Sequence, residues 1–250
     1  MLEPAAPVHS ITVISRLLLW DVDGTLVRAG DIGAAVFDRA IEAVFGVRPP
    51  ERVRMSGKTD PQIVREYLDM MGVVSSGGIV EAILRGVEGQ LAAAAASGEL
   101  AAGGAACPGA ADVLAALSGD DRIVSSLLTG NVYPNAVTKV GVFGLERWLD
   151  LDVGAYGSDH ADRRELVPIA LGRLEAERDV LIEASDVWVI GDTPRDLECA
   201  RVAGARCLLV GTGRYGIAEL ADLGADAVVE NLAGTEAIVE LLAGDLQAAA

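Results

Sequence analysis

The sequence has few aromatic residues and no long uninterrupted apolar segment. Aromatic residues make up 4% of the 250 residues although 51% are hydrophobic, so we expect a core of aliphatic side chains. No apolar run reaches the roughly 20 residues that a transmembrane helix needs, and no membrane segment is expected. The N-terminal stretch carries Glu3 and Arg16 and does not resemble a signal peptide. We therefore expect a cytoplasmic protein.

Cysteines are also scarce. The three cysteines, Cys107, Cys199 and Cys207, are odd in number and show no CxxC spacing. This pattern argues against a disulfide framework and against a zinc site. We expect each of them to be a small buried apolar residue.

Positive charge is the third feature in short supply. The formal net charge is −17, and the 20 basic residues include only two lysines, Lys58 and Lys139. A protein without a basic surface lacks what binds a phosphate backbone, so a nucleic-acid partner is not expected. An anionic substrate would have to be attracted by a local group of cations. The oligomeric state is left open.

The first part of the chain predicts one strand, or two short ones, followed only by helices. The apolar run at 11–20 predicts the strand, and the small-residue segment 101–109 predicts a linker. Asp60 is the expected N-cap of the middle helix, with Pro61 at its first helical position. Helical periodicity covers residues 31–45, 59–72 and 76–100.

From residue 122 onward the pattern alternates between strands and helices. Strands are expected within 122–130, 149–159, 186–192, 205–211 and 226–230, and helices within 133–144, 165–177, 193–204, 217–224 and at the C-terminus. Short apolar strands alternating with helices are typical of a buried parallel sheet. We therefore predict an α/β fold with a Rossmann-like, three-layer core formed by residues 1–27 and 105–250. Residues 28–104 would form an inserted, all-helical domain.

Polar residues follow three of the expected strands. In RLLLWDVDGTLV the apolar run ends in Asp21 and Asp23, residues 129–131 (TGN) end the next strand, and Asp192 with Asp196 follows a third. Such residues are common in turns and helix caps, which is the ordinary interpretation of each cluster alone. The carboxyl ends of parallel strands meet at one edge of a sheet, where open α/β sheets bind ligands.

Together these residues suit phosphoryl chemistry. Asp21, Asp192 and Asp196 would form an oxygen-rich site for a hard cation such as Mg2+, which also explains why neighbouring carboxylates tolerate each other. A carboxylate can act as a nucleophile, and a second one two residues away can transfer protons. Gly24 would allow the backbone to aim both side chains into one pocket. An EF-hand calcium loop does not fit, because its further ligands are missing.

The motifs DVDGTL, LLTGN and GDTPRD, in this order, resemble those of the haloacid dehalogenase-like (HAD) hydrolase superfamily. The helical block lies where many members carry a helical cap. The resemblance implies that Asp21 is the nucleophile, Asp23 the general acid/base and Thr129 a ligand of the transferring phosphoryl group. It implies a Mg2+ site built from Asp21, Asp23, Asp192 and Asp196, and phosphate or substrate contacts from Gly24, Thr25, Gly130, Asn131 and Lys58.

One motif departs from the family pattern. Members of the family carry a lysine before the strand that ends in GD, and residues 158–174 contain none. Arg163 or Arg164 would have to supply that cation, and we favour Arg163. Arginine stays charged and can hold a phosphate with two hydrogen bonds, so the exchange is physically reasonable.

The sequence therefore predicts a Mg2+-dependent phosphatase that hydrolyses a small phosphorylated metabolite through an aspartyl phosphate, similar to phosphoglycolate phosphatases. A phosphotransferase or phosphomutase would need the same core, and a catalytically silent binding protein is the third alternative. Lys58 is either a substrate contact or a surface residue. The GTGRYG segment at 211–216 resembles a dinucleotide-binding motif, but it lies too late in the chain for that function.

Overall fold

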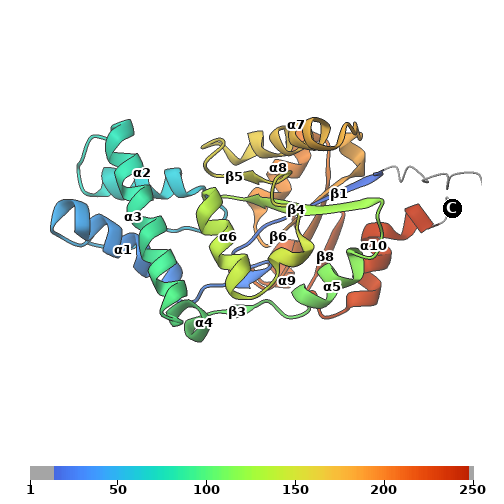
Figure 1. Ribbon diagram of the computed structural model, residues 1–250, viewed down its shortest axis with the longest axis horizontal. Coiled ribbons are helices and arrows are strands. Elements are labelled where there is room, and N and C mark those ends of the chain that lie inside the picture. Colours follow the sequence, from blue (N-terminus) through green and yellow to red (C-terminus); the bar gives the residue numbers. More distant parts are fainter. Residues whose placement is uncertain (1–13, 248–250) are drawn as a thin grey trace, which may run out of the picture.

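The computed structural model describes residues 14–247, and a six-stranded sheet lies at its centre (Figure 1). Its strand order is β5-β4-β1-β6-β7-β8, and every neighbouring pair is parallel. The strands are β1 (Arg16–Trp20), β4 (Ile123–Thr129), β5 (Ala155–Tyr156), β6 (Val187–Gly191), β7 (Arg206–Val210) and β8 (Ala227–Val229). The predicted α/β fold with a parallel sheet is confirmed.

Helices cover both faces of the sheet and complete three layers (Figure 1). One face packs on α5 (Ala110–Leu117), α6 (Tyr133–Val142) and α10 (Thr235–Gln247), and the other on α7 (Leu166–Arg178), α8 (Pro194–Ala203) and α9 (Ile217–Ala221). Successive side chains of a strand point to opposite faces, so Leu18 and Trp20 join the first cluster and Leu17 and Leu19 the second. This is why β1 is apolar at every position.

Four helices form a separate block beside the sheet (Figure 1). They are α1 (Ile32–Phe45), α2 (Asp60–Met70), α3 (Gly77–Ala96) and α4 (Glu99–Gly103), and they share a hydrophobic cluster of their own. Two chain segments connect the block to the sheet and pair as an antiparallel ribbon, β2 (Val27–Arg28) with β3 (Ala105–Ala106). The division into a core and a domain at 28–104 stays a prediction.

Some local expectations were wrong. Thr59, not Asp60, caps α2, because its backbone is extended and its hydroxyl accepts a hydrogen bond from the N–H of Gln62. The segment 101–109 is not a plain linker, since it contains the end of α4 and strand β3. Helix α5 was not expected, although its apolar residues have helical spacing. The described part of the chain also contains three short 3-10 turns: Glu146–Trp148, Arg163–Glu165 and Ala184–Asp186.

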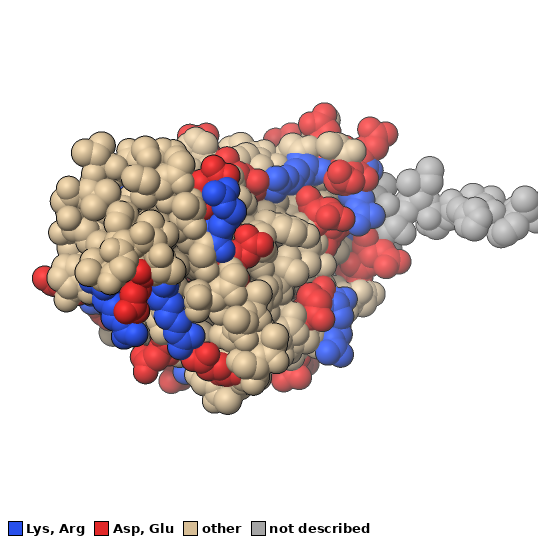
Figure 2. Space-filling model, turned by 60° about the vertical axis from the view of Figure 1, so that its left-hand side comes forward, with Lys and Arg blue, Asp and Glu red and all other residues tan. Residues whose placement is uncertain are grey.

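The expected strand at 11–20 begins only at Arg16, and positions 11–13 lie outside the described residues. Within residues 14–247, no helix has both the length and the apolar character that crossing a bilayer requires. On the face drawn in Figure 2, basic side chains lie mostly beside acidic ones and form no extended basic area. The absence of a nucleic-acid partner stays a prediction.

Candidate active site

The three motif strands are neighbours at the centre of the sheet, and their carboxyl ends open into one cavity. Asp21 follows β1, Thr129 ends β4 and Asp192 follows β6. The cavity has a volume of about 310 Å³ and lies between this edge of the sheet and the helical block. Its lining includes Asp21, Asp23, Gly24, Lys58, Thr129, Gly130, Asn131, Arg163 and Asp192. Thr25 and Asp196 do not line it, because both side chains are completely buried.

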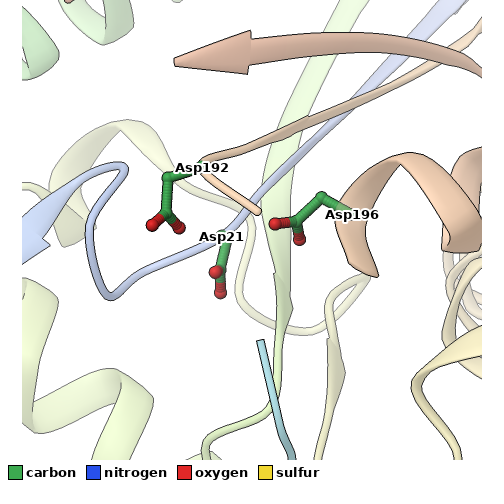
Figure 3. Close-up of side chains that lie close together, drawn as sticks. All are labelled: Asp21, Asp192 and Asp196. Carbon is green, nitrogen blue, oxygen red and sulfur yellow. The ribbon is translucent and has the colours of Figure 1, made fainter. Parts of the chain in front are cut away.

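Three carboxylates converge at the buried end of this cavity. Oxygen atoms of Asp21, Asp192 and Asp196 lie within 4.8 Å of one another, and the three side chains lie close together (Figure 3). Burial raises the pKa of Asp21 to about 6, against the opposing effect of the Arg163 charge. Burial and the charges of the other two carboxylates raise the pKa of Asp192 to about 9. Without a bound cation, Asp192 therefore keeps its proton at neutral pH, and the three groups favour a cation that would let all of them ionise.

Asp192 shows most clearly that a cation would fit. Its Oδ1 atom is buried and has no hydrogen-bond partner among the described residues. A Cβ atom at Gly213 would lie 1.6 Å from Asp192 Oδ2, and one at Gly24 would lie 2.5 Å from it. Two glycines thus leave space for this carboxylate, and an oxygen-only donor set suits a hard ion such as Mg2+.

Asp196 differs from Asp192 because both of its oxygens are occupied. Its Oδ2 accepts hydrogen bonds from the N–H and the hydroxyl of Thr193, at 3.0 and 2.7 Å. Its Oδ1 accepts a hydrogen bond from the guanidinium of Arg163. Asp196 therefore supports the site by holding its neighbours.

The structure places Arg163 in the cavity and Arg164 at the surface. Arg163 Nη2 lies 3.2 Å from Asp21 Oδ1 and donates to the carbonyl oxygen of Leu128, also at 3.2 Å. Burial alone would lower the pKa of Arg163, but the charges of Asp196 and Asp21 outweigh it and raise the pKa. Arg164 is half exposed and pairs with Asp162.

A second polar group surrounds Asp23 at the open end of the cavity. Lys139 Nζ, on α6, lies 2.8 and 2.6 Å from the two carboxylate oxygens of Asp23. Asn131 Nδ2 donates to Asp23 Oδ2 at 2.8 Å and to Thr129 Oγ1 at 2.9 Å. Lys139 was not among the site residues predicted from the sequence. Two signals were available: lysine is rare in this chain, which has only one other, and Lys139 lies on the helix that follows TGN.

The turn formed by residues 58–60, which we call the docking turn, joins the helical block to residues 129–132, which contain the TGN motif. We call residues 129–132 the phosphate-motif loop. The N–H of Asp60 donates to the carbonyl of Gly130 at 2.7 Å. Asp60 Oδ2 accepts from the N–H of Val132 at 2.9 Å and from Asn135 Nδ2 at 3.0 Å. A Cβ atom at Gly130 would lie 2.0 Å from the carbonyl oxygen of Lys58, so only glycine fits this contact.

Lys58 lines the cavity, but its ammonium group pairs with Glu66 of the same helical block. The GTGRYG segment forms the loop after β7, and its Gly213 packs against Asp192 at the cavity wall. This loop therefore belongs to the same site. The three cysteines are free and buried, as expected, and burial raises the pKa of Cys107 to about 11.

The fold and the site resemble those of the haloacid dehalogenase-like hydrolases, with a helical insertion after the first strand. A family model described as HAD-hydrolase-like matches residues 164–235, which include Asp192 and Asp196. The resemblance predicted from the three sequence motifs is therefore confirmed. A search of the curated proteins gives no match.

Several solved structures share the fold over most of the chain. CbbY from Rhodobacter sphaeroides, in complex with phosphate, has a TM-score of 0.68 at 23% identity and covers 88% of this chain and 95% of its own. A hydrolase from Pseudomonas syringae has a TM-score of 0.68 at 19% identity, covering 91% and 99%. A predicted phosphoglycolate phosphatase from Haemophilus somnus 129PT has a TM-score of 0.65 at 16% identity, covering 91% and 99%.

Proposed function

We propose that this protein is a Mg2+-dependent phosphatase that hydrolyses a small phosphate monoester through an aspartyl phosphate on Asp21. Residues 28–104 act as its cap. The observation that carries the proposal is the convergence of Asp21 with a buried cation, Arg163, and with Asp192, whose Oδ1 has no hydrogen-bond partner among the described residues. The HAD-like family match supports the same class of enzyme.

In the first half-reaction an oxygen of Asp21 attacks the phosphorus atom of the ester. The bond from phosphorus to the leaving oxygen breaks, and that oxygen takes a proton from the Asp23 carboxyl group. Thr129 Oγ1 accepts hydrogen bonds from the backbone and side-chain nitrogens of Asn131, so its own proton is free to bind a phosphoryl oxygen. Arg163 keeps Asp21 oriented through the 3.2 Å contact.

In the second half-reaction a water molecule gives a proton to Asp23 and attacks the phosphorus atom. The bond between phosphorus and the Asp21 oxygen breaks, which releases inorganic phosphate and restores the carboxylate. Asp21, Asp192 and the backbone carbonyl of Asp23 would hold Mg2+, with Asp196 in support. When bound, the ion neutralises charge on the carboxylates and on the phosphoryl oxygens.

The cap limits the substrate and protects the intermediate. The cavity of about 310 Å³ suits a small phosphorylated metabolite. The docking turn closes over the phosphate-motif loop through Asp60 and Gly130, which would exclude bulk water from the reacting atoms. A location in the cytoplasm stays a prediction.

Release of inorganic phosphate from aryl, sugar and glycolate phosphates, with Mg2+ or with EDTA, tests the proposal. We expect Mg2+-dependent release, and a loss of at least about 1,000-fold in Asp21→Asn, which lacks the nucleophile. Asp112→Asn, at an exposed position of α5, is the matched control and should retain activity. An active Asp21→Asn enzyme would contradict the proposal. Transfer of the phosphoryl group to a second sugar without release would indicate a mutase or phosphotransferase instead.

A further inference from the structure

Lys139 is a buried cation that the mechanism above does not use. Its side chain is 9% exposed, and it projects from α6 into the wall of the cavity. Burying an ammonium group costs several kcal/mol unless charged and polar partners replace the lost water. Its partners should therefore indicate what it does.

All three hydrogen-bonding directions of the Lys139 ammonium are occupied. It lies 2.8 and 2.6 Å from the two Asp23 oxygens and 2.7 Å from Asn131 Oδ1. An ammonium group has three N–H donors and no acceptor. Lys139 therefore has no donor left for a phosphoryl oxygen while these contacts persist. The two buried cations of the cavity thus contact different carboxylates: Lys139 contacts Asp23, whereas Arg163 contacts Asp21 and Asp196.

Asn131 extends the contact from Lys139 to the phosphate-motif loop. Its carbonyl oxygen accepts from Lys139, and its amide nitrogen donates both to Asp23 and to Thr129 Oγ1. One amide group thus fixes the distance between Asp23, the proposed proton donor, and Thr129, the proposed phosphoryl ligand. The Asp23 side chain is still 45% exposed, so it remains open to a substrate in the cavity.

We propose that Lys139 is a positioning residue for the acid/base carboxyl group of Asp23. Together with Asn131 it holds this group in one orientation relative to Thr129, and it does not touch the substrate. The inference rests on the proposed phosphatase function and deepens it. It also explains why a buried lysine stands on the helix that follows TGN.

The chemistry of the first half-reaction shows where this positioning matters. As Asp23 gives its proton to the leaving oxygen, negative charge develops on its carboxylate, beside the Lys139 ammonium and the Asn131 amide. Groups fixed in advance around a developing charge stabilise it without reorganisation. Proton donation is essential for an alkoxide leaving group and much less so for p-nitrophenolate, a weak base. Loss of Lys139 should therefore depend on the leaving group.

The test compares Lys139→Met with the wild type on an alkyl phosphate and on p-nitrophenyl phosphate, both with Mg2+. We expect kcat/KM, which reports the first half-reaction, to fall about 100-fold on the alkyl phosphate and far less on p-nitrophenyl phosphate, because only the alkyl leaving group needs the proton. Inhibition by inorganic phosphate should change little. Lys139→Arg, which keeps the charge and donors, should recover part of the loss. Lys139→Gln serves as a second neutral variant, and thermal unfolding of each protein verifies that it is folded.

Arg173→Met is the matched control, because it also breaks a partly buried ion pair, with Asp159, away from the cavity. It should show no dependence on the leaving group. Equal losses on both substrates, or a raised KM with weaker inhibition by inorganic phosphate, would overturn the positioning role and indicate a direct phosphate contact or a merely structural effect. A wild type without Mg2+-dependent turnover would instead contradict the proposed function itself.

Discussion

The two halves of the cavity differ in how completely their charges are balanced. In the buried half, Arg163 pairs with Asp21 and Asp196, and Asp192 Oδ1 has no hydrogen-bond partner within residues 14–247. In the half that faces the cap, the Asp23 carboxylate is fully engaged by a lysine and an amide. The buried half therefore needs a cation from solution to complete its polar contacts. In the cap-facing half, side chains of the protein supply the contacts of Asp23.

The two halves are therefore held in place by different means, the buried half by protons and a cation and the cap-facing half by packing of the chain. The buried half has raised pKa values at Asp21 and Asp192, so its state depends on pH and on a bound cation. The geometry of the cap-facing half depends on helix packing and on the docking turn. Solution conditions should therefore act mainly on the first half, and substitutions in α6 or α2 mainly on the second.

The largest effect is expected from Asp192→Asn. Loss of this proposed Mg2+ ligand should lower Mg2+-dependent turnover by at least about 100-fold. The same variant should be more stable than the wild type in EDTA at pH 7.5, because the wild type must keep a buried carboxyl group with a raised pKa. Phosphate release and thermal unfolding in EDTA measure the two effects. A variant that loses stability in EDTA would show that the buried half is balanced without a cation.

The second effect concerns the space around Asp192. Gly213→Ala would place a Cβ atom 1.6 Å from Asp192 Oδ2 and displace this carboxylate. We expect the Mg2+ concentration for half-maximal activity to rise by about tenfold, as for other changes that misorient a metal ligand. Gly216→Ala in the same loop is the control, since its nearest contact would be 3.7 Å. Similar Mg2+ requirements in both variants would argue against Asp192 as a ligand.

The third effect is the pH dependence of the metal-free protein. The pKa is about 6 for Asp21 and about 9 for Asp192, both above the ordinary aspartate value of 3.8. The folded state therefore binds more protons than the unfolded state, and stability should fall as the pH rises from about 5 to about 9. Saturating Mg2+ should oppose this fall, because it binds the ionised carboxylates. Thermal unfolding across this pH range, with EDTA and with Mg2+, measures both slopes. If stability fell equally with pH in EDTA and in Mg2+, the assignment of Asp21 and Asp192 as Mg2+ ligands would be contradicted.

The sequence predicted the buried half better than the cap-facing half. The residues of the buried half follow β1 and β6, and a parallel sheet brings the carboxyl ends of its strands together whatever the loops do. Lys139 could not be placed in the same way, because its contact with Asp23 depends on how α6 packs against the loop after β1. The one-turn spacing of Asn135 and Lys139 shows that they share a helix face, but not what that face meets.

Asp60 shows the same limit at the docking turn. A local rule assigns an aspartate before a proline to the N-cap of a helix, and Thr59 beside it satisfies the same rule. Tertiary contacts decided between them, because Asp60 is buried and finds its donors, Val132 N–H and Asn135 Nδ2, on the core. Burial raises the pKa of this carboxyl group, which agrees with a tight docking contact.

The smallest effect compares two helix caps of the helical block. Thr59→Ala and Ser76→Ala each remove a side-chain oxygen that accepts from a first-turn N–H, and each should lower stability by about 1 kcal/mol. Only the Thr59 hydroxyl also donates to the core, to the carbonyl of Ala161 at 2.9 Å. Turnover should therefore fall a few-fold in Thr59→Ala and stay unchanged in Ser76→Ala, as measured by phosphate release beside denaturant unfolding. Equal turnover in the two variants would show that the docking turn holds the cap without help from this hydroxyl.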